Sequence, residues 1–120
     1  MNLGFITTSR ADFGIYIPLL RAIDREHWTV YIFAGGMHTS SRFGNSYRLI
    51  EDEYNFKIAE KIDSALDDDS SAGIGRSMGV TTSNFSAVWQ KYRDRLDVVF
   101  AMGDRFEMFS AALALLPFNI

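Results

Sequence analysis

The 120-residue chain contains no cysteine, which excludes a disulfide framework, catalysis by a thiolate and any metal site built on cysteine ligands. A long hydrophobic run is missing as well, because no apolar stretch approaches the roughly 20 residues that a membrane-spanning helix needs. The apolar N-terminal residues Met1 to Ile6 are too few for a signal peptide, and Arg10 and Asp12 follow closely. We therefore expect a cytoplasmic protein with no membrane partner.

An excess of basic residues is also absent. The 12 lysines and arginines are outnumbered by 15 aspartates and glutamates, and the formal net charge is -3. Binding to the phosphate backbone of nucleic acid needs a basic face, so we expect no nucleic-acid partner, although local arginines can still bind small anions. No internal repeat or low-complexity linker divides the chain, and 48% hydrophobic residues suffice for one compact core.

Four short apolar or alternating runs predict strands, at residues 3–6, 28–34, 56–60 and 98–102. Apolar residues at helical spacing predict helices between and after these strands, over residues 13–23, 43–53, 85–95 and 106–116. Strands that alternate with helices imply right-handed crossovers. The predicted fold class is therefore α/β, with a mostly parallel sheet and helices on both faces.

The first and last helices carry more specific predictions. Ser9 and Asp12 have the pattern of a capping box at the start of the first helix. Pro18 lies inside that helix, so we expect the regular helix either to begin near Ile15 or to bend at Gly14. The apolar face that we predict for the last helix carries Phe106, Phe109, Leu113 and Leu116.

Two segments are similar to ligand sites but do not meet their requirements. The run from Asp67 to Asp69 lacks the alternating spacing and the glycine of a calcium loop, so a solvated loop is the better interpretation. The segment from Gly73 to Gly79 is similar to a dinucleotide-binding glycine pattern, but it has one residue too many and does not follow a strand. We expect neither a metal nor a cofactor.

Three loops follow predicted strands, at residues 7–10, 35–38 and 103–105. Because the carboxyl ends of parallel strands meet at one edge of a sheet, these loops are expected to converge there, where such sheets bind ligands. Arg10 and Arg105 would offer planar, bidentate donors suited to phosphate, and the adjacent helix starts add free backbone N–H groups. The predicted ligand is a phosphorylated or nucleotide-linked molecule.

Each of these residues also has a purely structural interpretation. Arg10 can form a local ion pair with Asp12 at the helix start instead of binding phosphate. His38 can be a loop histidine bonded to backbone, and Asp104 can cap the helix that follows it instead of acting in catalysis. His27, at a helix end before a strand, is expected to lie on the surface.

Four ordered segments of the sequence resemble the N-terminal portion of the hydrolysing UDP-N-acetylglucosamine 2-epimerases of the sialic-acid pathway. They are residues Thr8–Gly14, Gly36–His38, Phe43–Glu51 and Gly103–Glu107. The resemblance extends over essentially the whole chain, and it implies a fold of two Rossmann-like domains of the glycosyltransferase-B type with the active site between them. Residues 1–120 would then be a partial N-terminal Rossmann-like domain without the C-terminal domain.

The resemblance also implies an activity and a set of site residues. Such enzymes remove the proton on the second carbon of the sugar, eliminate UDP to give a glycal, and add water to release N-acetylmannosamine. Asp104 matches the catalytic aspartate, Arg105 an arginine that contacts the nucleotide, and Arg10 the arginine that holds UDP. The remaining residues expected near the substrate are Ser9, Gly36, Met37 and His38.

Some family features are missing. Gly35 stands where the family commonly has threonine, and Leu96-Asp97 lacks the usual proline before a strand. A His-x-x-Gly-Gly-Glu-like segment and the remaining catalytic residues would follow Ile120, so we expect this chain alone to be inactive. The family generally forms homo-oligomers, and we expect the same of the full-length protein.

Two alternatives stay open. One is a non-hydrolysing UDP-sugar 2-epimerase or another glycosyltransferase-B-like protein, and the other is a non-catalytic nucleotide- or phosphate-binding module that uses only Arg10 and Arg105. A diacetamido sugar is likewise an alternative to N-acetylglucosamine as the sugar of the substrate.

Overall fold

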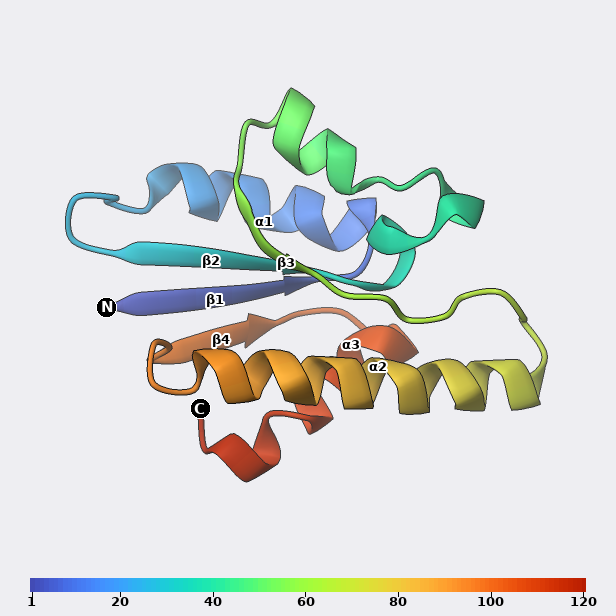
Figure 1. The fold of residues 1–120 in the computed structure, drawn as a ribbon. Coiled ribbons are helices and arrows are strands. Elements are labelled where there is room, and N and C mark those ends of the chain that lie inside the picture. Colours follow the sequence, from blue (N-terminus) through green and yellow to red (C-terminus); the bar gives the residue numbers. More distant parts are fainter.

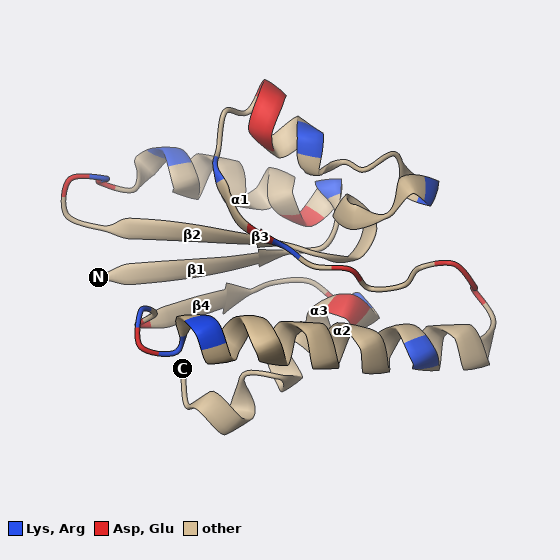
Figure 2. Cartoon of the chain, in the orientation of Figure 1, with Lys and Arg blue, Asp and Glu red and all other residues tan.

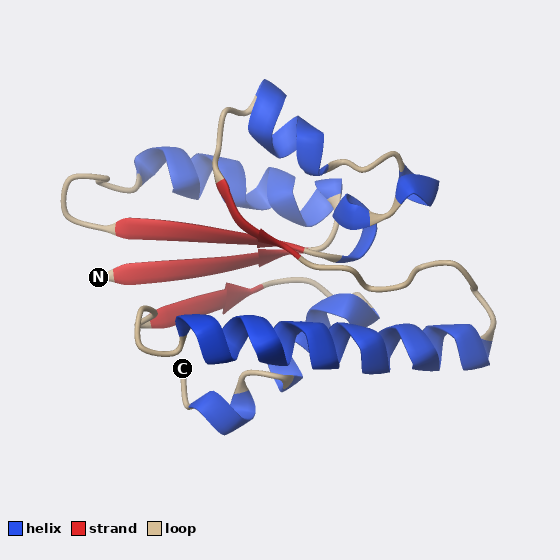
Figure 3. Cartoon of the chain, viewed as in Figure 1, coloured by secondary structure: helices blue, strands red, loops and turns tan.

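The computed structural model describes residues 1–120 and contains one four-stranded sheet in which all neighbouring strands are parallel. The strands are β1 (Asn2–Thr7), β2 (Thr29–Ala34), β3 (Ile58–Lys61) and β4 (Val98–Ala101), and their order across the sheet is β3-β2-β1-β4. Figure 3 shows that their arrowheads all lie at the same end of the sheet. The prediction of an α/β fold with a parallel sheet is confirmed.

Strand β1 lies inside the sheet and pairs with β2 on one side and β4 on the other. Its Leu3 is opposite Val30 of β2 and Val98 of β4. Every residue of β1 after Asn2 is buried. A parallel strand that is covered on both faces needs such a continuous apolar run. This explains why the first residues of the sequence do not alternate between apolar and polar side chains.

Helices cover both faces of the sheet. Figure 1 shows α1 (Arg10–Ala22) on one side and α2 (Ser71–Tyr92) and α3 (Phe106–Leu113) on the other. Neighbouring side chains of a strand point to opposite faces, so Phe5 belongs to the core under α1 whereas Ile6 belongs to the core under α2 and α3. None of these helices is long and apolar enough to cross a bilayer.

The capping box at the start of α1 is confirmed. The Ser9 side chain accepts the backbone N–H of Asp12, and the Asp12 side chain accepts the backbone N–H of Ser9. This reciprocal cap satisfies N–H groups that a helix start leaves without partners, so the helix begins at Arg10. Of the two alternatives for this helix, the later start near Ile15 is wrong, and the helix continues past Pro18.

The helix predicted over residues 43–53 is only partly present. The chain forms 3₁₀ turns at Gly36–Thr39 and Ser41–Phe43, and regular helical geometry returns as a π-helix at Leu49–Glu53. Gly44 and Asn45 separate these segments with left-handed φ angles of 81° and 48°. A right-handed helix cannot continue through that conformation, which is why the predicted helix is interrupted.

Helix α2 begins well before residue 85, where the sequence predicts a helix to begin, because the Ser70 side chain caps the Gly73 N–H at 3.0 Å. A Cβ on Gly73 would lie 2.4 Å from Cγ of Asp68, so glycine permits the close approach of the preceding loop. The segment from Gly73 to Gly79 therefore lies in the first part of a helix and follows a loop. A dinucleotide-binding motif would follow a strand, so the prediction that this segment is not such a motif is confirmed.

The acidic loop before α2 is solvated, as predicted. Its carboxylates form exposed ion pairs with two arginines, Asp69 with Arg42 at 2.6 Å and Asp67 with Arg76 at 3.2 Å. Figure 2 shows the acidic segments on the loop that leads into α2. Exposed pairs of this kind contribute little to stability. Hydrogen bonds from Ser77 and Asn84 of α2 to the carbonyls of Ala65 and Asp63 also hold the segment.

Helix α3 presents the face opposite to the one predicted. Phe109 is 59% exposed and Leu116, just beyond the helix, is 74% exposed, whereas the buried face carries Glu107, Met108, Ser110 and Ala111. This buried face meets α2, where the indole N–H of Trp89 donates to the carbonyl of Ala111 at 3.0 Å. Small side chains at this contact permit that approach, and the large apolar ones point away.

Trp89→Ala is expected to lower the free energy of unfolding by about 3–5 kcal/mol, because a fully buried indole leaves a cavity. Leu116→Ala is the control, and its effect is expected to stay within about 0.5 kcal/mol because the side chain is exposed. Urea unfolding followed by circular dichroism measures both. Similar losses in the two variants would contradict this packing.

Candidate functional site

A cavity of about 480 Å³ lies at the carboxyl ends of the strands, where the loops after β1, β2 and β4 meet. Its charged and hydroxyl-bearing lining residues are Thr8, Ser9, Arg10, Asp12, Ser46, Asp104 and Arg105. Its apolar lining residues are Ala11, Ile15, Met37, Phe43, Met102 and Met108. The predicted convergence of three loops at one sheet edge is therefore present in the structure.

Five of the seven residues predicted for the site line this cavity, namely Ser9, Arg10, Met37, Asp104 and Arg105. Gly36 and His38 do not line it and are buried behind it. Gly36 has a φ of +56°, and a Cβ there would lie 2.8 Å from the carbonyl oxygen of Thr8. Glycine at this position lets the loop after β2 pack directly against the loop after β1.

The ion pair between Arg10 and Asp12, which was the structural alternative to phosphate binding, does not form. Asp12 turns into the protein, while Arg10 is exposed at the cavity and takes part in none of the salt bridges of the structure. The guanidinium of Arg10 therefore has its donors available for an anion.

Arg105 differs from Arg10 because a carboxylate already holds it. Its Nη2 and Nε donate to Oε1 and Oε2 of Glu107 at 2.6 and 3.0 Å. Glu107 is fully buried, so this bidentate pair fixes the plane of the guanidinium while its other N–H groups stay unused. Sequence reasoning assigned no role to Glu107, although a glutamate two residues after the arginine in a helix start was the available signal.

Asp104 does not cap the following helix. The N-cap position of α3 is Arg105, without a side-chain cap, and the Asp104 carboxylate has no hydrogen-bond partner at this exposed edge of the cavity. Gly103 before it has a φ of +121°, a conformation that L side chains rarely adopt. This glycine turns the chain at the end of β4 so that Asp104 reaches the cavity.

Asp12 is a site residue that sequence reasoning treated only as a cap or as an ion-pair partner of Arg10. The residue is 7% exposed, and its carboxylate accepts the backbone N–H groups of Thr8 and Ser9, each at 3.0 Å. The hydroxyl groups of Thr7, Thr8 and Ser9 donate to it as well.

Burial, and secondarily the Asp12 charge, raise the pKa of Tyr16 to about 12.

His38 is fully buried, and both ring nitrogens are engaged. Nε2 lies 2.8 Å from the Thr7 hydroxyl, and Nδ1 lies 2.8 Å from the Ser46 hydroxyl. Because the Thr7 hydroxyl donates its one hydrogen to Asp12, its oxygen accepts from Nε2–H, and Nδ1 then accepts from Ser46. Burial lowers the pKa of His38, which favours the neutral imidazole over its protonated form.

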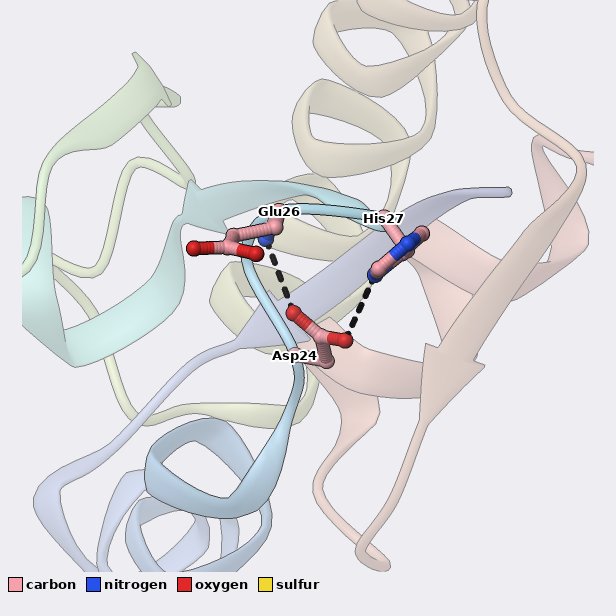
Figure 4. A group of neighbouring side chains, drawn as sticks. All are labelled: Asp24, Glu26 and His27. Atoms are coloured by element: carbon pink, nitrogen blue, oxygen red, sulfur yellow. Dashed lines mark hydrogen bonds and ion pairs between the residues drawn. The ribbon is translucent and has the colours of Figure 1, made fainter.

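One exposed cluster of potential metal ligands lies at the other end of the strands, before β2. Figure 4 shows its members, Asp24, Glu26 and His27. Asp24 accepts the backbone N–H of Glu26 at 3.0 Å and contacts Nδ1 of His27 at 2.6 Å. These contacts stabilise a turn, and the predicted surface position of His27 is confirmed.

Comparison with known proteins assigns the family. A family model for UDP-N-acetylglucosamine 2-epimerases matches residues 21–120. The chain belongs to this family. A polysialic acid biosynthesis protein of Escherichia coli, P7, is 32% identical over 117 residues, and a hydrolysing GDP/UDP-N,N'-diacetylbacillosamine 2-epimerase of Campylobacter jejuni is 33% identical over 116 residues. These matches include 97% and 96% of the chain but only 29% of each relative.

Solved structures of family members share the fold. A UDP-GlcNAc 2-epimerase from Neisseria meningitidis, bound to UDP-GlcNAc, gives a TM-score of 0.76 at 16% identity, over 100% of this chain and 30% of that one. A putative family member from Listeria monocytogenes gives 0.77 at 15% identity, over 98% of this chain and 29% of that one. The chain therefore shares its fold with about 30% of the length of each of these structures.

Both departures from the family pattern fit the packing. A Cβ on Gly35 would lie 3.0 Å from the Phe85 ring, so glycine leaves room for that ring. The backbone N–H of Asp97 donates to the Asn2 carbonyl at 3.0 Å, and its carboxylate accepts the Asn2 N–H at 2.7 Å. Proline at position 97 would lose the first bond, so aspartate instead ties β4 to β1.

His38 predicts how stability depends on pH. The pKa of His38 in the folded chain is lower than the ordinary value of 6.5. Just below pH 6.5, the unfolded chain therefore binds a proton at this histidine, whereas the folded chain does not. The free energy of unfolding is therefore expected to fall as pH drops from 7.5 to 5. Urea unfolding at several pH values measures this, and His38→Gln should flatten the slope. An unchanged slope in that variant would contradict the buried neutral imidazole.

Proposed function

We propose that the chain forms part of the active site of a hydrolysing UDP-N-acetylglucosamine 2-epimerase and supplies the wall that holds the diphosphate. The observation that carries this proposal is that Arg10, Arg105 and Asp104 line one cavity at the carboxyl edge of the sheet. Membership of the epimerase family and the UDP-GlcNAc named in the Neisseria structure support a UDP-sugar as the ligand.

Arg10 is the proposed anchor for the diphosphate. It stands at the first position of α1, where the helix dipole and the unpaired N–H groups of the first turn favour an anion. Its guanidinium has no competing carboxylate, in contrast to Arg105. Arg105 would contact the nucleotide with the N–H groups that Glu107 leaves free.

Asp104 is the proposed base. In the proposed reaction it takes the proton from the second carbon of the sugar, while UDP leaves from the first carbon with its charge stabilised by the two arginines. Addition of water to the resulting glycal, with return of a proton to the second carbon, then gives N-acetylmannosamine. This route consumes one water and releases UDP.

A diacetamido sugar is the second candidate substrate. The apolar wall of the cavity, which includes Ile15 and Phe43, suits methyl groups better than hydroxyl groups. Relatives from Campylobacter jejuni and Legionella pneumophila are named as diacetylbacillosamine 2-epimerases. Product analysis separates a hydrolysing enzyme, which yields a free sugar and UDP, from a non-hydrolysing one, which yields an intact UDP-sugar.

Arg10→Ala is expected to weaken UDP binding by this chain about tenfold to a hundredfold, the loss that a hydrogen-bonded charged contact gives. Isothermal titration with UDP measures the affinity. Arg21→Ala is the matched control, because Arg21 is an exposed arginine in the last turn of the same helix. Equal affinities of the Arg10 and Arg21 variants would contradict the proposed anchor.

The chain by itself is expected to release no UDP from UDP-N-acetylglucosamine above background. Only one carboxylate in the cavity, Asp104, is free of hydrogen bonds, whereas elimination followed by hydration needs further acid and base groups. A coupled assay for UDP measures this. Turnover by the chain alone would contradict the proposal that further catalytic groups come from outside this chain. Binding of UDP without turnover would agree with that proposal.

A further inference from the structure

We propose that His38 is a positioning residue that shapes the Thr8–Arg10 loop for anion binding without touching the ligand. This inference rests on the proposed function, because it concerns how Arg10 is presented to a diphosphate. The hydrogen bonds that carry it run from the cavity edge at Ser46 through His38 and Thr7 to the buried carboxylate of Asp12.

The direction of each hydrogen bond follows from the number of hydrogens available. Ser46 donates to Nδ1 of His38, Nε2–H of His38 donates to Thr7, and Thr7 donates to Asp12. The alternative acceptor for Thr7, the Ser9 carbonyl, is more distant at 3.4 Å. His38 therefore orients the Thr7 hydroxyl so that its hydrogen points at the carboxylate.

Asp12 links the orientation of the Thr7 hydroxyl to the backbone that precedes Arg10. One of its oxygens, Oδ2, accepts the N–H groups of Thr8 and Ser9, the two residues that immediately precede the arginine. The other oxygen, Oδ1, accepts the hydroxyl of Thr7. Rotation of the carboxylate would break both sets of contacts together, so the orientation of Asp12 and the shape of the loop are coupled.

No other group near Thr7 can replace His38 as the hydrogen-bond donor to its hydroxyl. The charged groups that act on the imidazole are Asp12 and Arg10, both on α1, and the Phe13 ring packs edge-on at 6.5 Å between centroids. Thr7, Thr8 and His38 are fully buried, so bulk water cannot replace a lost donor. The imidazole is also shut off from the cavity, which separates a positioning role from direct contact with a ligand.

The test compares variants that keep or remove the donor to Thr7. His38→Leu removes both hydrogen bonds, whereas His38→Gln keeps an N–H that can reach Thr7. His27→Leu is the matched control, because His27 is the other histidine and is exposed at the far end of the strands. Each variant is titrated with UDP, and amide hydrogen exchange of Thr8 and Ser9 is measured in the free chain.

We expect His38→Leu to bind UDP about tenfold more weakly, and its Thr8 and Ser9 amides to exchange at least about tenfold faster than in the parent chain. His38→Gln should restore most of both properties, and His27→Leu should match the parent chain. Weakened binding with Thr8 and Ser9 still protected would overturn the proposal, because that result indicates direct contact. Unchanged affinity in His38→Leu would overturn it as well.

Two further outcomes are separated by the same design. If the parent chain binds no UDP, the proposed function fails, and the exchange rates alone decide whether His38 holds the loop. If His38→Leu does not fold, Ser46→Ala takes its place, since it removes one bond of the network and leaves the imidazole buried. Protection of Thr8 and Ser9 in Ser46→Ala equal to that in the parent chain would then contradict the network.

Discussion

The carboxylate of Asp12 is buried, and no lysine or arginine forms an ion pair with it. A buried acceptor of this kind is stable only if hydrogen-bond donors replace the water that it has lost. Three hydroxyl groups and two backbone N–H groups do so, and all five come from the consecutive residues Thr7, Thr8 and Ser9. The end of β1, its loop and the start of α1 are consequently one rigid unit.

The rest of the cavity is built around that unit. The loop after β2 packs on it through Gly36, and the Met37 N–H donates to the Thr8 carbonyl at 2.8 Å. The loop after β4 reaches the same edge because β4 is the other neighbour of β1 in the sheet. Parallel pairing thus places Asp104 and Arg105 across the cavity from Arg10, although they lie far apart in the sequence.

The two arginines differ in a way that suits different tasks. Arg105 is fixed in orientation by the buried Glu107, whereas Arg10 is exposed and forms no salt bridge. A fixed guanidinium recognises one geometry, and a free one can follow a diphosphate as it enters or leaves. This difference agrees with the proposed reaction, in which UDP is the leaving group.

Local patterns in the sequence were enough to predict the four strands, the capping box of α1 and the meeting of three loops, because each depends on neighbouring residues or on the parallel arrangement. The orientation of α3 was not predictable in this way. Periodicity indicates that Phe109 and Leu113 share a face, but the small residues that meet α2 decide which face is buried. The burial of His38 likewise depends on Thr7 and Ser46, which are 31 and 8 residues away.

The most direct test of this account is to titrate the isotopically labelled chain with UDP and follow the backbone amide signals. We predict that the largest shifts occur at Ser9, Arg10 and the Gly103–Arg105 loop, with little change at the Asp24–His27 turn at the other end of the strands. Saturable binding whose shifts lie away from these two loops, or no shift at all, would contradict the proposal that this cavity binds the diphosphate.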